Sequence, residues 1–510
     1  MGLNTLDWTI VAAYLGLVFF IGFRVARQTG GDRSFFLADR SFPVWAVALS
    51  VMATNLSAAT YISSPEISFR GNLAFLLLPL GTIPAAYVIA YGYLPKLYAA
   101  GTVTVYGFLG QRYGFPVRMT ASLIYVLGRM LAGGARLFIA GIAFSLVLYG
   151  DTSGPHLVAA IMIFGICGIL YTTAGGLRAV VWTDTLQITL VAVAACCSIY
   201  LLLQMIPLNV SEIMDLLRAD PDGDKLLLLD WRFSLSDPFT VWALLIGAAV
   251  SQAADYGSSQ DTMQRLFAAK SSRAAVRSLV YSSFITVPVV LFFLIIGLLL
   301  YVFYTRPDIM GSFAPDDPLL DPKGVFPQFL LNHLPPGFKG LAIAGVFAAA
   351  MSTVDSNINS MASTVVTDIY EPLKWRNSSN GDPKNGNDNL TTPRIAVVGI
   401  GLALIAFACL AVYMHSRGVQ TLISFALGIF AFATAPLFGV MSAAVWTERG
   451  NNKSVLTALI AGLITVLLLQ PYMLPKWIDV PIAWTWWWII TCPIVFCIAV
   501  AGKPRRGVEG

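Results

Sequence analysis

The stretch ATNLSAATYISS, residues 53–64, interrupts an apolar segment with small residues, hydroxyl residues and an asparagine. A second stretch, DYGSSQD at residues 255–261, puts a glycine and two acids where a membrane-spanning helix would be uniformly apolar. Polar, irregular backbone at bilayer depth is tolerated only where it lines a cavity. The two stretches therefore predict two broken helices that line a binding cavity.

The composition of the chain requires a membrane. Hydrophobic residues make up 57% of its 510 residues and charged residues only 12%, which leaves too few polar side chains to wet the surface of a soluble protein. Apolar segments long enough to cross the hydrocarbon core number about thirteen. We predict an all-α polytopic membrane protein of the cell (inner) membrane, with one transmembrane domain over residues 1–510.

The breaks fall in predicted spans two and seven. A separation of five spans predicts a five-plus-five inverted repeat, in which broken helices hold the substrate at mid-membrane. The core repeats are expected at about residues 42–206 and 238–446, with peripheral helices at 7–26, 453–474 and 480–502. Lys and Arg gather in loops such as 264–273, so the positive-inside rule predicts an outside N-terminus and a cytoplasmic C-terminus.

Other functional classes have little support in the sequence. A channel needs a continuous pore lined by carbonyls or charges, whereas the polar breaks here are isolated, so a channel is a remote alternative. No HExxH or GxSxG motif occurs, and we predict no enzymatic activity. The expected partners are a small-molecule solute, a cation and the lipid bilayer, with no nucleic acid and no partner protein implied.

A third polar stretch, MSTVDSNINS at residues 351–360, lies inside another apolar span. Residues three and four apart share a helix face, so Ser352, Thr353, Asp355 and Ser356 fall on overlapping stripes. Hydroxyls, together with carbonyls freed by a broken helix, suit a hard cation such as sodium. The alternative, a hydroxyl stripe that only joins helices, does not explain a carboxylate at mid-membrane, which is normally functional.

Four segments together resemble the sodium/solute symporter family: SVMATNLSAATYIS, YTTAGGLRAVVWTDTLQ, SSQDTMQRLFAAKS and AGVFAAAMSTVDSNINSMASTVVTDIY. The resemblance implies a sodium-coupled symporter that works by alternating access. It also implies a main sodium site, made from the carbonyls of Ala53, Leu56 and Ala349 and the hydroxyls of Ser352 and Thr353.

Members similar to the sialic acid transporters carry a second sodium site, built from an aspartate and three serines. Here Asp184 matches the aspartate, and Ser352, Asp355 and Ser356 occupy the serine positions. The departure is Asp355, which either binds a second sodium ion or stays protonated beside Asp184. One or two sodium ions are therefore expected. A helix cap is the alternative for Asp184.

The solute is less clearly indicated. Ser57, Thr60 and Phe75 match positions that resemble substrate-binding residues of the sialic acid transporters, but the family's arginine is replaced by Ala132. Arg129 and Arg136 flank that position. Either arginine can hold a carboxylate bidentately or pair with an intramembrane acid.

Residues of the second break suggest an alternative solute. Asp255, Tyr256 and Gln260 suit the hydroxyls of a neutral sugar. We therefore predict sodium-coupled import of a small polar organic acid, namely a sugar acid, a sialate-like acid or a monocarboxylate. A neutral sugar is the alternative.

Overall fold

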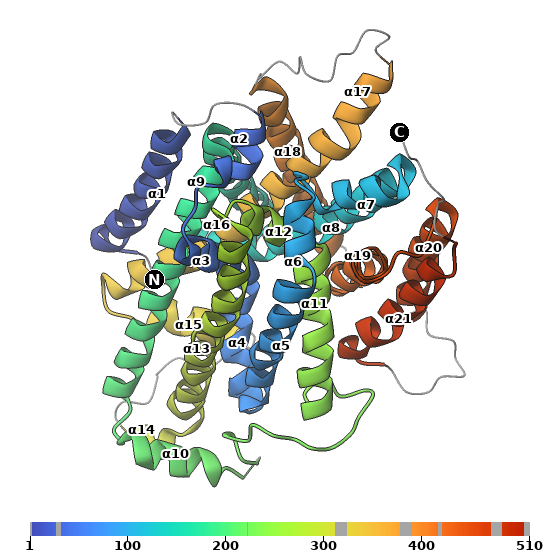
Figure 1. Cartoon of the computed structure of the whole chain (residues 1–510). Helices are drawn as coiled ribbons and strands as arrows, with labels where there is room; N and C mark the ends of the chain where they lie inside the picture. The colour runs from blue at the N-terminus through green and yellow to red at the C-terminus, as the bar shows by residue number, and fades with distance from the viewer. Residues whose placement is uncertain are drawn as a thin grey trace.

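The chain folds into a bundle of helices (Figure 1). The computed structural model describes residues 3–26, 32–221, 223–311, 324–377, 390–416, 421–470 and 482–503. In these ranges the only β feature is an isolated bridge between Phe42 and Ala269. Helices satisfy every backbone hydrogen bond within one segment, which apolar spans require in a lipid environment. The predicted all-α class is confirmed.

The first half of the chain contains α1 to α10. Their bounds are α1 Thr5–Ala26, α2 Asp32–Leu37, η1 Ala38–Arg40, α3 Val44–Asn55, α4 Ala58–Arg70, η2 Leu73–Leu76, α5 Leu77–Gly92, α6 Leu94–Ala99, α7 Val105–Tyr113, α8 Phe115–Tyr149, α9 Gly154–Met205 and α10 Val210–Arg218. Helix α9 bends at Gly176, whose φ of 54° is non-helical.

The second half begins with a π-helix. Its elements are η3 Trp242–Gly247, α11 Ala248–Ser258, α12 Gln260–Phe267, α13 Ser272–Thr305, α14 Pro307–Met310, α15 Val325–Asn332, α16 Phe338–Thr364, η6 Val365–Tyr370, α17 Glu371–Asn377, α18 Thr391–Ser416, α19 Thr421–Trp446, α20 Asn452–Leu468, η7 Trp484–Trp486 and α21 Trp487–Val500. The end of predicted span 453–474 and the start of span 480–502 fall in 471–481, outside the described residues.

The described helices include seven that are long and apolar enough to cross a membrane, or eight if the bent pair α3 and α4 counts as one span. Three shorter apolar helices lie at Phe430–Trp446, Asn452–Leu468 and Trp484–Val500. The chain is thus a multi-pass membrane protein. The number of about thirteen spans stays a prediction.

Both predicted breaks occur. Helix α3 ends at Asn55, Leu56 and Ser57 are extended, and α4 continues at an angle of 63° to α3. Helix α11 ends at Ser258, and the extended Ser259 separates it from α12. In each case a polar stretch replaces regular helix inside an apolar span, as expected for backbone that borders a cavity.

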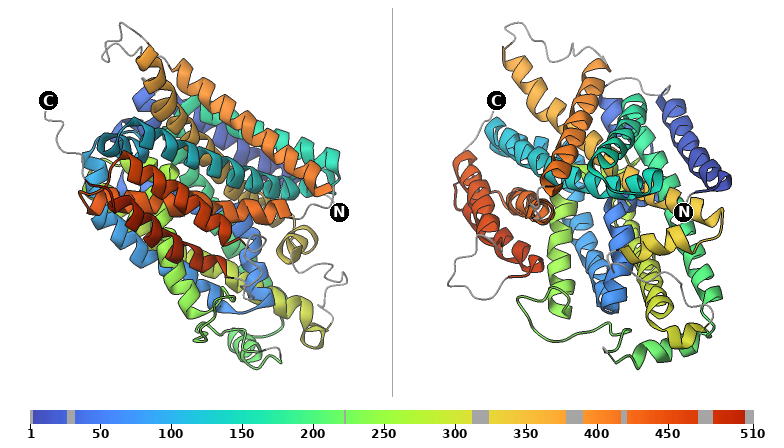
Figure 2. Two further views of the ribbon diagram at one scale, coloured as in Figure 1. Left: turned by 90° about the vertical axis from the view of Figure 1, so that its right-hand side faces the viewer. Right: turned by 180° about the vertical axis from the view of Figure 1, so that it is seen from behind.

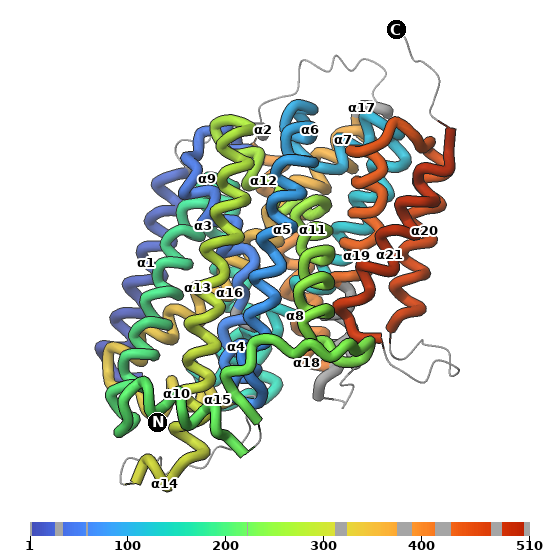
Figure 3. The backbone as a smooth tube through the Cα atoms, turned by 60° about the horizontal axis from the view of Figure 1, so that its bottom comes forward, coloured from blue at the N-terminus to red at the C-terminus, as the bar shows by residue number. Residues whose placement is uncertain are grey.

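Helix α16 lies at the centre of the bundle. Its residues 351–360 are all buried, and it packs against α9, α8, α1 and α18. Figures 1 to 3 show α1 at one edge of the molecule and α20 and α21 at the opposite edge, where they pack on α19. This arrangement surrounds the polar stretch 351–360 with protein.

Helix α13 is joined closely to α4. A Cβ atom added at Gly297 of α13 would lie 2.0 Å from the Pro65 carbonyl oxygen and 2.1 Å from Ser68 Oγ. Ser68 Oγ also donates to the Leu294 carbonyl at 2.8 Å. Only glycine permits this approach, so α4 is fixed against α13.

Candidate cation and solute site

The end of α3 and the middle of α16 meet at the main candidate cation site. The Ser352 hydroxyl lies 3.2 Å from the Ala53 carbonyl oxygen and 3.1 Å from that of Ala349. The Thr353 hydroxyl lies 3.3 Å from the same Ala349 oxygen. Leu56, in extended conformation, follows the last turn of α3. The structure thus brings these residues together at the helix break.

The donor set at this site consists of neutral oxygens. Described residues include no group of three His, Cys, Asp or Glu side chains that could hold a metal ion. Carbonyl and hydroxyl oxygens suit a hard monovalent cation, because they provide ligands without excess negative charge. Ser352 is the residue that reaches both helices, and its contact with Ala53 joins α16 to the broken span.

A guanidinium lies at the second candidate site. Arg265 of α12 is fully buried, and its Nη2 atom lies 3.0 Å from Asp184 Oδ2 and 2.5 Å from Ser356 Oγ. Its Nε atom lies 2.8 Å from Ser50 Oγ, and its Nη1 atom donates to the Asp261 carbonyl at 2.8 Å. Asp184 is therefore a partner in a buried ion pair that links four helices.

Asp355 lies beside this ion pair and has its own partners. Its Oδ2 atom accepts a hydrogen bond from the Tyr171 hydroxyl at 2.5 Å, and its Oδ1 atom lies 3.3 Å from Ser356 Oγ. Ser356 Oγ also contacts the Ser352 carbonyl oxygen. Ser356 thus connects the second candidate site with the main one, as the helical spacing predicts.

Arg129 on α8 holds the two halves of the second broken span. Its Nη2 atom lies 3.0 Å from Asp255 Oδ1 in α11 and 2.8 Å from Asp261 Oδ1 in α12. All three side chains are about 95% buried or more. The sequence leaves two roles open for Arg129, binding of a solute carboxylate and pairing with an intramembrane acid. The structure has the ion pair.

Arg136 lies about two helical turns further along α8 and has different surroundings. In the part of the chain that the structure describes, it has no ion pair and no hydrogen bond, and its guanidinium lies 6.0 Å from the centre of the Phe430 ring. The Arg129 guanidinium lies 5.3 Å from the same ring. The two arginines therefore share an aromatic neighbour but differ in charge pairing.

Ser57 and Thr60 lie at the first break. Ser57 caps α4, with its Oγ atom 3.3 Å from the Thr60 backbone nitrogen and 3.4 Å from Thr60 Oγ1. Asp255 and Tyr256 lie at the end of α11, both buried. The Gln260 amide binds the start of α7 and the segment before it, through the Val105 N–H and the Val103 carbonyl, each at 3.0 Å.

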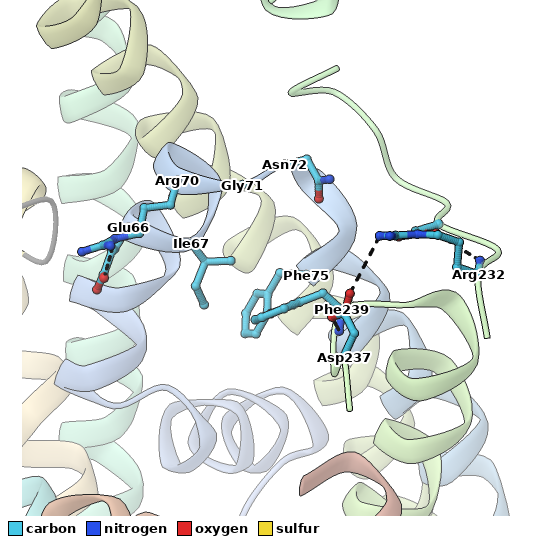
Figure 4. A pocket seen from close by; sticks show the side chains of 10 residues that line it. Glu66, Ile67, Arg70, Gly71, Asn72, Phe75, Arg232, Asp237 and Phe239 are labelled. Carbon is cyan, nitrogen blue, oxygen red and sulfur yellow. Dashed lines mark hydrogen bonds and ion pairs between the residues drawn. The ribbon is translucent and has the colours of Figure 1, made fainter. Parts of the chain in front are cut away.

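Phe75 lies at the far end of α4 from Ser57 and Thr60, beyond about 15 Å of helix. It lines an open pocket of about 420 Å³. Figure 4 shows Phe75 and Phe239 between two charged pairs, Arg70 with Glu66 and Arg232 with Asp237. Phe75 thus lines an open pocket that lies away from the helix breaks.

Sequence reasoning missed Arg265, because it assigned residues 264–273 to a basic loop. The structure corrects this assignment: α12 continues to Phe267, and Arg265 is buried because Asp184 and Ser356 pair with it. The spacing of Asp261 and Arg265, one helical turn apart, would have indicated a different pair, because the Asp261 carboxylate binds Arg129 and Arg265 reaches the Asp261 carbonyl. Ser50 and Tyr171 carried no comparable signal.

Comparison with known proteins agrees with this architecture. The sequence profile of the sodium:solute symporter family matches residues 35–462. The sodium/sialic acid symporter NanT of Aliivibrio fischeri is 26% identical over 91% of this chain and 87% of its own length. The corresponding symporter SiaT of Proteus mirabilis is 25% identical over 91% of this chain and 89% of its own length.

A solved structure has the same fold. It is the substrate-bound outward-open state of a Na+-coupled sialic acid symporter, with a TM-score of 0.83 and 23% identity. The alignment covers 98% of this chain and 97% of that one. The two broken helices and the central polar helix therefore belong to an architecture seen in a solved transporter.

Proposed function

The chain belongs to the sodium:solute symporter family, and from that premise we propose that it imports a small organic acid together with sodium. Sodium-coupled symport is the activity of the family, and an acidic solute is the class that the site supports best. The proposed activity is transport by alternating access, without chemical conversion of the solute. The relatives NanT and SiaT are symporters of sialic acid, which is an acid.

Arg136 is the observation that carries the proposal. Its neighbour Arg129 is neutralised by two carboxylates, whereas Arg136 has no ion pair among the described residues. A charged group inside a membrane protein normally faces a partner or a water-filled cavity. A guanidinium binds a carboxylate bidentately, so a solute carboxylate is the natural partner for Arg136.

The sodium ion binds next to this site in our proposal. Its ligands are the carbonyls of Ala53, Leu56 and Ala349 and the hydroxyls of Ser352 and Thr353. Because Leu56 and Ser57 are consecutive residues of the first break, the ion and the solute would touch the same short segment. We propose that this shared segment is how the binding of one affects the binding of the other.

The remaining candidate residues take different roles. Ser57 and Thr60 are proposed to contact polar groups of the solute at the first break. Phe75 is proposed to act at the outer mouth, where the solute enters. Asp255, and Gln260 through its backbone contacts, are proposed to shape the second break, because their side chains already have protein partners.

The orientation in the membrane is also a proposal. We propose that the N-terminus is outside and the C-terminus is in the cytoplasm, in the inner membrane of the cell. The gathering of Lys and Arg on one side of the predicted spans supports this orientation. We also propose the repeats at about 42–206 and 238–446, each of which would open with one of the two broken spans. Cysteine-accessibility labelling of a residue introduced into the segment 376–391, which this orientation places in the cytoplasm, would test the orientation.

A neutral sugar is the second candidate, and one observation favours it. Arg129 and Arg136 together carry two positive charges, and Asp255 and Asp261 carry two negative charges. This set is balanced without an acidic solute. A co-transported sodium ion would, however, balance the charge that an acid brings.

The test is uptake into vesicles that contain the purified protein and carry an inward sodium gradient. Labelled N-acetylneuraminic acid, a labelled monocarboxylate and a labelled neutral sugar are offered separately and in competition. We expect sodium-driven uptake of an acid and little uptake of the sugar. Sodium-driven uptake of the neutral sugar alone would contradict the proposed solute class.

The variant Arg136→Gln assigns the role of the arginine. We expect it to lose acid uptake, because the solute carboxylate would be buried without a charge partner. Arg136→Lys, which keeps the charge but not the planar fork, should lose most of the affinity and keep some transport. Full acid uptake by Arg136→Gln would show that this residue does not bind the solute.

A further inference from the structure

We infer that the Arg265 guanidinium occupies the place of a second cation, so that the protein binds one sodium ion per transport cycle. The inference rests on the sodium coupling in the proposed function but not on the identity of the solute. Its subject is the cluster of Asp184, Asp355, Ser356 and Arg265, hereafter the arginine cluster. The resemblance to sialic acid transporters predicts a second sodium ion at these positions.

The polar atoms of the arginine cluster face the guanidinium. Asp184 Oδ2 accepts hydrogen bonds from Nη2 and Nε of Arg265, at 3.0 and 3.2 Å, and from the Ser50 hydroxyl at 2.5 Å. The Ser356 oxygen receives Arg265 at 2.5 Å. Every nitrogen of this guanidinium has a partner among the described residues. A fixed cation thus already holds Asp184 Oδ2 and Ser356 Oγ, two of the atoms at which the resemblance places a second sodium ion.

One carboxylate oxygen of the ion pair is left without a partner among the described residues. Asp184 Oδ1 is buried and has no hydrogen-bond partner in the described structure. It is a single ligand, whereas a hard cation requires several oxygens around it. Asp355 already has partners at this place, because its two oxygens contact Tyr171 and Ser356. A sodium ion at this place would have to displace Arg265 from its ion pair.

The formal charges support a single ion. With both carboxylates ionised, Asp184 and Asp355 contribute two negative charges, and Arg265, which pairs with Asp184, contributes one positive charge. One sodium ion at the neighbouring main site brings the sum of the region to zero. A second sodium ion would leave an excess positive charge in a buried region, which is unfavourable in a low dielectric.

The experiment counts sodium ions on the purified full-length protein in detergent, without solute. Equilibrium binding of ²²Na+ should saturate at about one ion per protein, with a Hill coefficient of about 1. Saturation of the unmodified protein at two ions would overturn the inference. Because no solute is present, a wrong proposal for the solute class cannot affect this result.

The variant Arg265→Gln tests the role of the guanidinium. Removing the fixed cation frees Asp184 Oδ2 and Ser356 Oγ, so we expect saturation at about two ions and a Hill coefficient that rises toward 2. Arg265→Lys keeps a cation and should still bind about one ion. If Arg265→Gln folds and binds one ion, the guanidinium is not what excludes the second, and the inference is wrong.

A matched control removes a different arginine. Arg118→Gln breaks the ion pair with the buried Asp368 at 2.7 Å, which involves no residue of the main sodium site or the arginine cluster. It should leave the sodium count at one. A second ion in this control as well would mean that loss of any arginine loosens the protein. Should Arg265→Gln fail to fold, the sodium counts of the unmodified protein and of Arg265→Lys still decide.

Discussion

Arg129 is predicted to be essential for the stability of the bundle. The variant Arg129→Gln removes the cation that lies 3.0 Å from Asp255 and 2.8 Å from Asp261. These carboxylates belong to the two sides of the break in the second broken span. Without Arg129, both would be buried side by side with no fixed positive partner.

The expected loss follows from the burial of the three side chains, each about 95% buried or more. Breaking a buried ion pair by removing one partner costs about 3–5 kcal/mol of unfolding free energy. Two carboxylates lose their partner here, so we expect the upper part of that range. Arg136→Gln is the matched control on the same helix and should stay within about 1 kcal/mol of the unmodified protein.

Denaturant titration in detergent micelles measures both unfolding free energies. Combining Arg129→Gln with Asp255→Asn and Asp261→Asn removes the uncompensated charges, so about 1–3 kcal/mol should return through coupling. Equal losses for Arg129→Gln and Arg136→Gln would refute the assignment of the ion pair. An unrescued triple variant would show that packing, and not charge, explains the loss.

Two further predictions concern the sodium site and the helix contact. Ser352→Ala or Thr353→Ala removes one oxygen ligand, which for a contact with a charge is worth about 1.5–3 kcal/mol, so apparent sodium affinity in uptake should fall about tenfold or more. Unchanged sodium dependence in both variants would exclude the site. Gly297→Ala forces α13 away from the Pro65 carbonyl and should lower the unfolding free energy by about 1–3 kcal/mol or more. Gly399→Ala, which meets nothing within 4 Å, should be tolerated; equal stability of the two variants would contradict the contact.

The breaks and the polar stripe could be predicted because they violate the pattern around them. Polar residues at 53–64 and 255–261 stand out against apolar spans, and only a cavity makes such backbone tolerable. Ser352 and Ser356 share a helix face by spacing alone, and the structure has them on one stripe that faces α3 and α12. The spacing of residues along one helix thus predicts which of its side chains lie on the same face.

Partners on other helices could not be predicted in the same way. Arg129 fits a solute carboxylate and an ion pair equally well from the sequence, because the distance to Asp255 and Asp261 depends on packing between distant segments. Arg265 lies near the end of a helix in the sequence, and basic residues next to an apolar span usually belong to a cytoplasmic loop. Its burial follows from Asp184, which is 81 residues away in the chain.

The contact between Gly297 and Pro65 has a mechanical consequence. The Pro65 carbonyl of α4 occupies the place that a side chain at Gly297 of α13 would take. The two helices therefore cannot slide past each other and are expected to move as one rigid unit. The hydrogen bond from Ser352 to Ala53 crosses a different helix interface, the one between the broken span and α16. Large rearrangements use hinges and sliding surfaces where packing allows them. An ion bound between α16 and the broken span would therefore restrain movement of the unit formed by α4 and α13. Release of the ion would allow that movement.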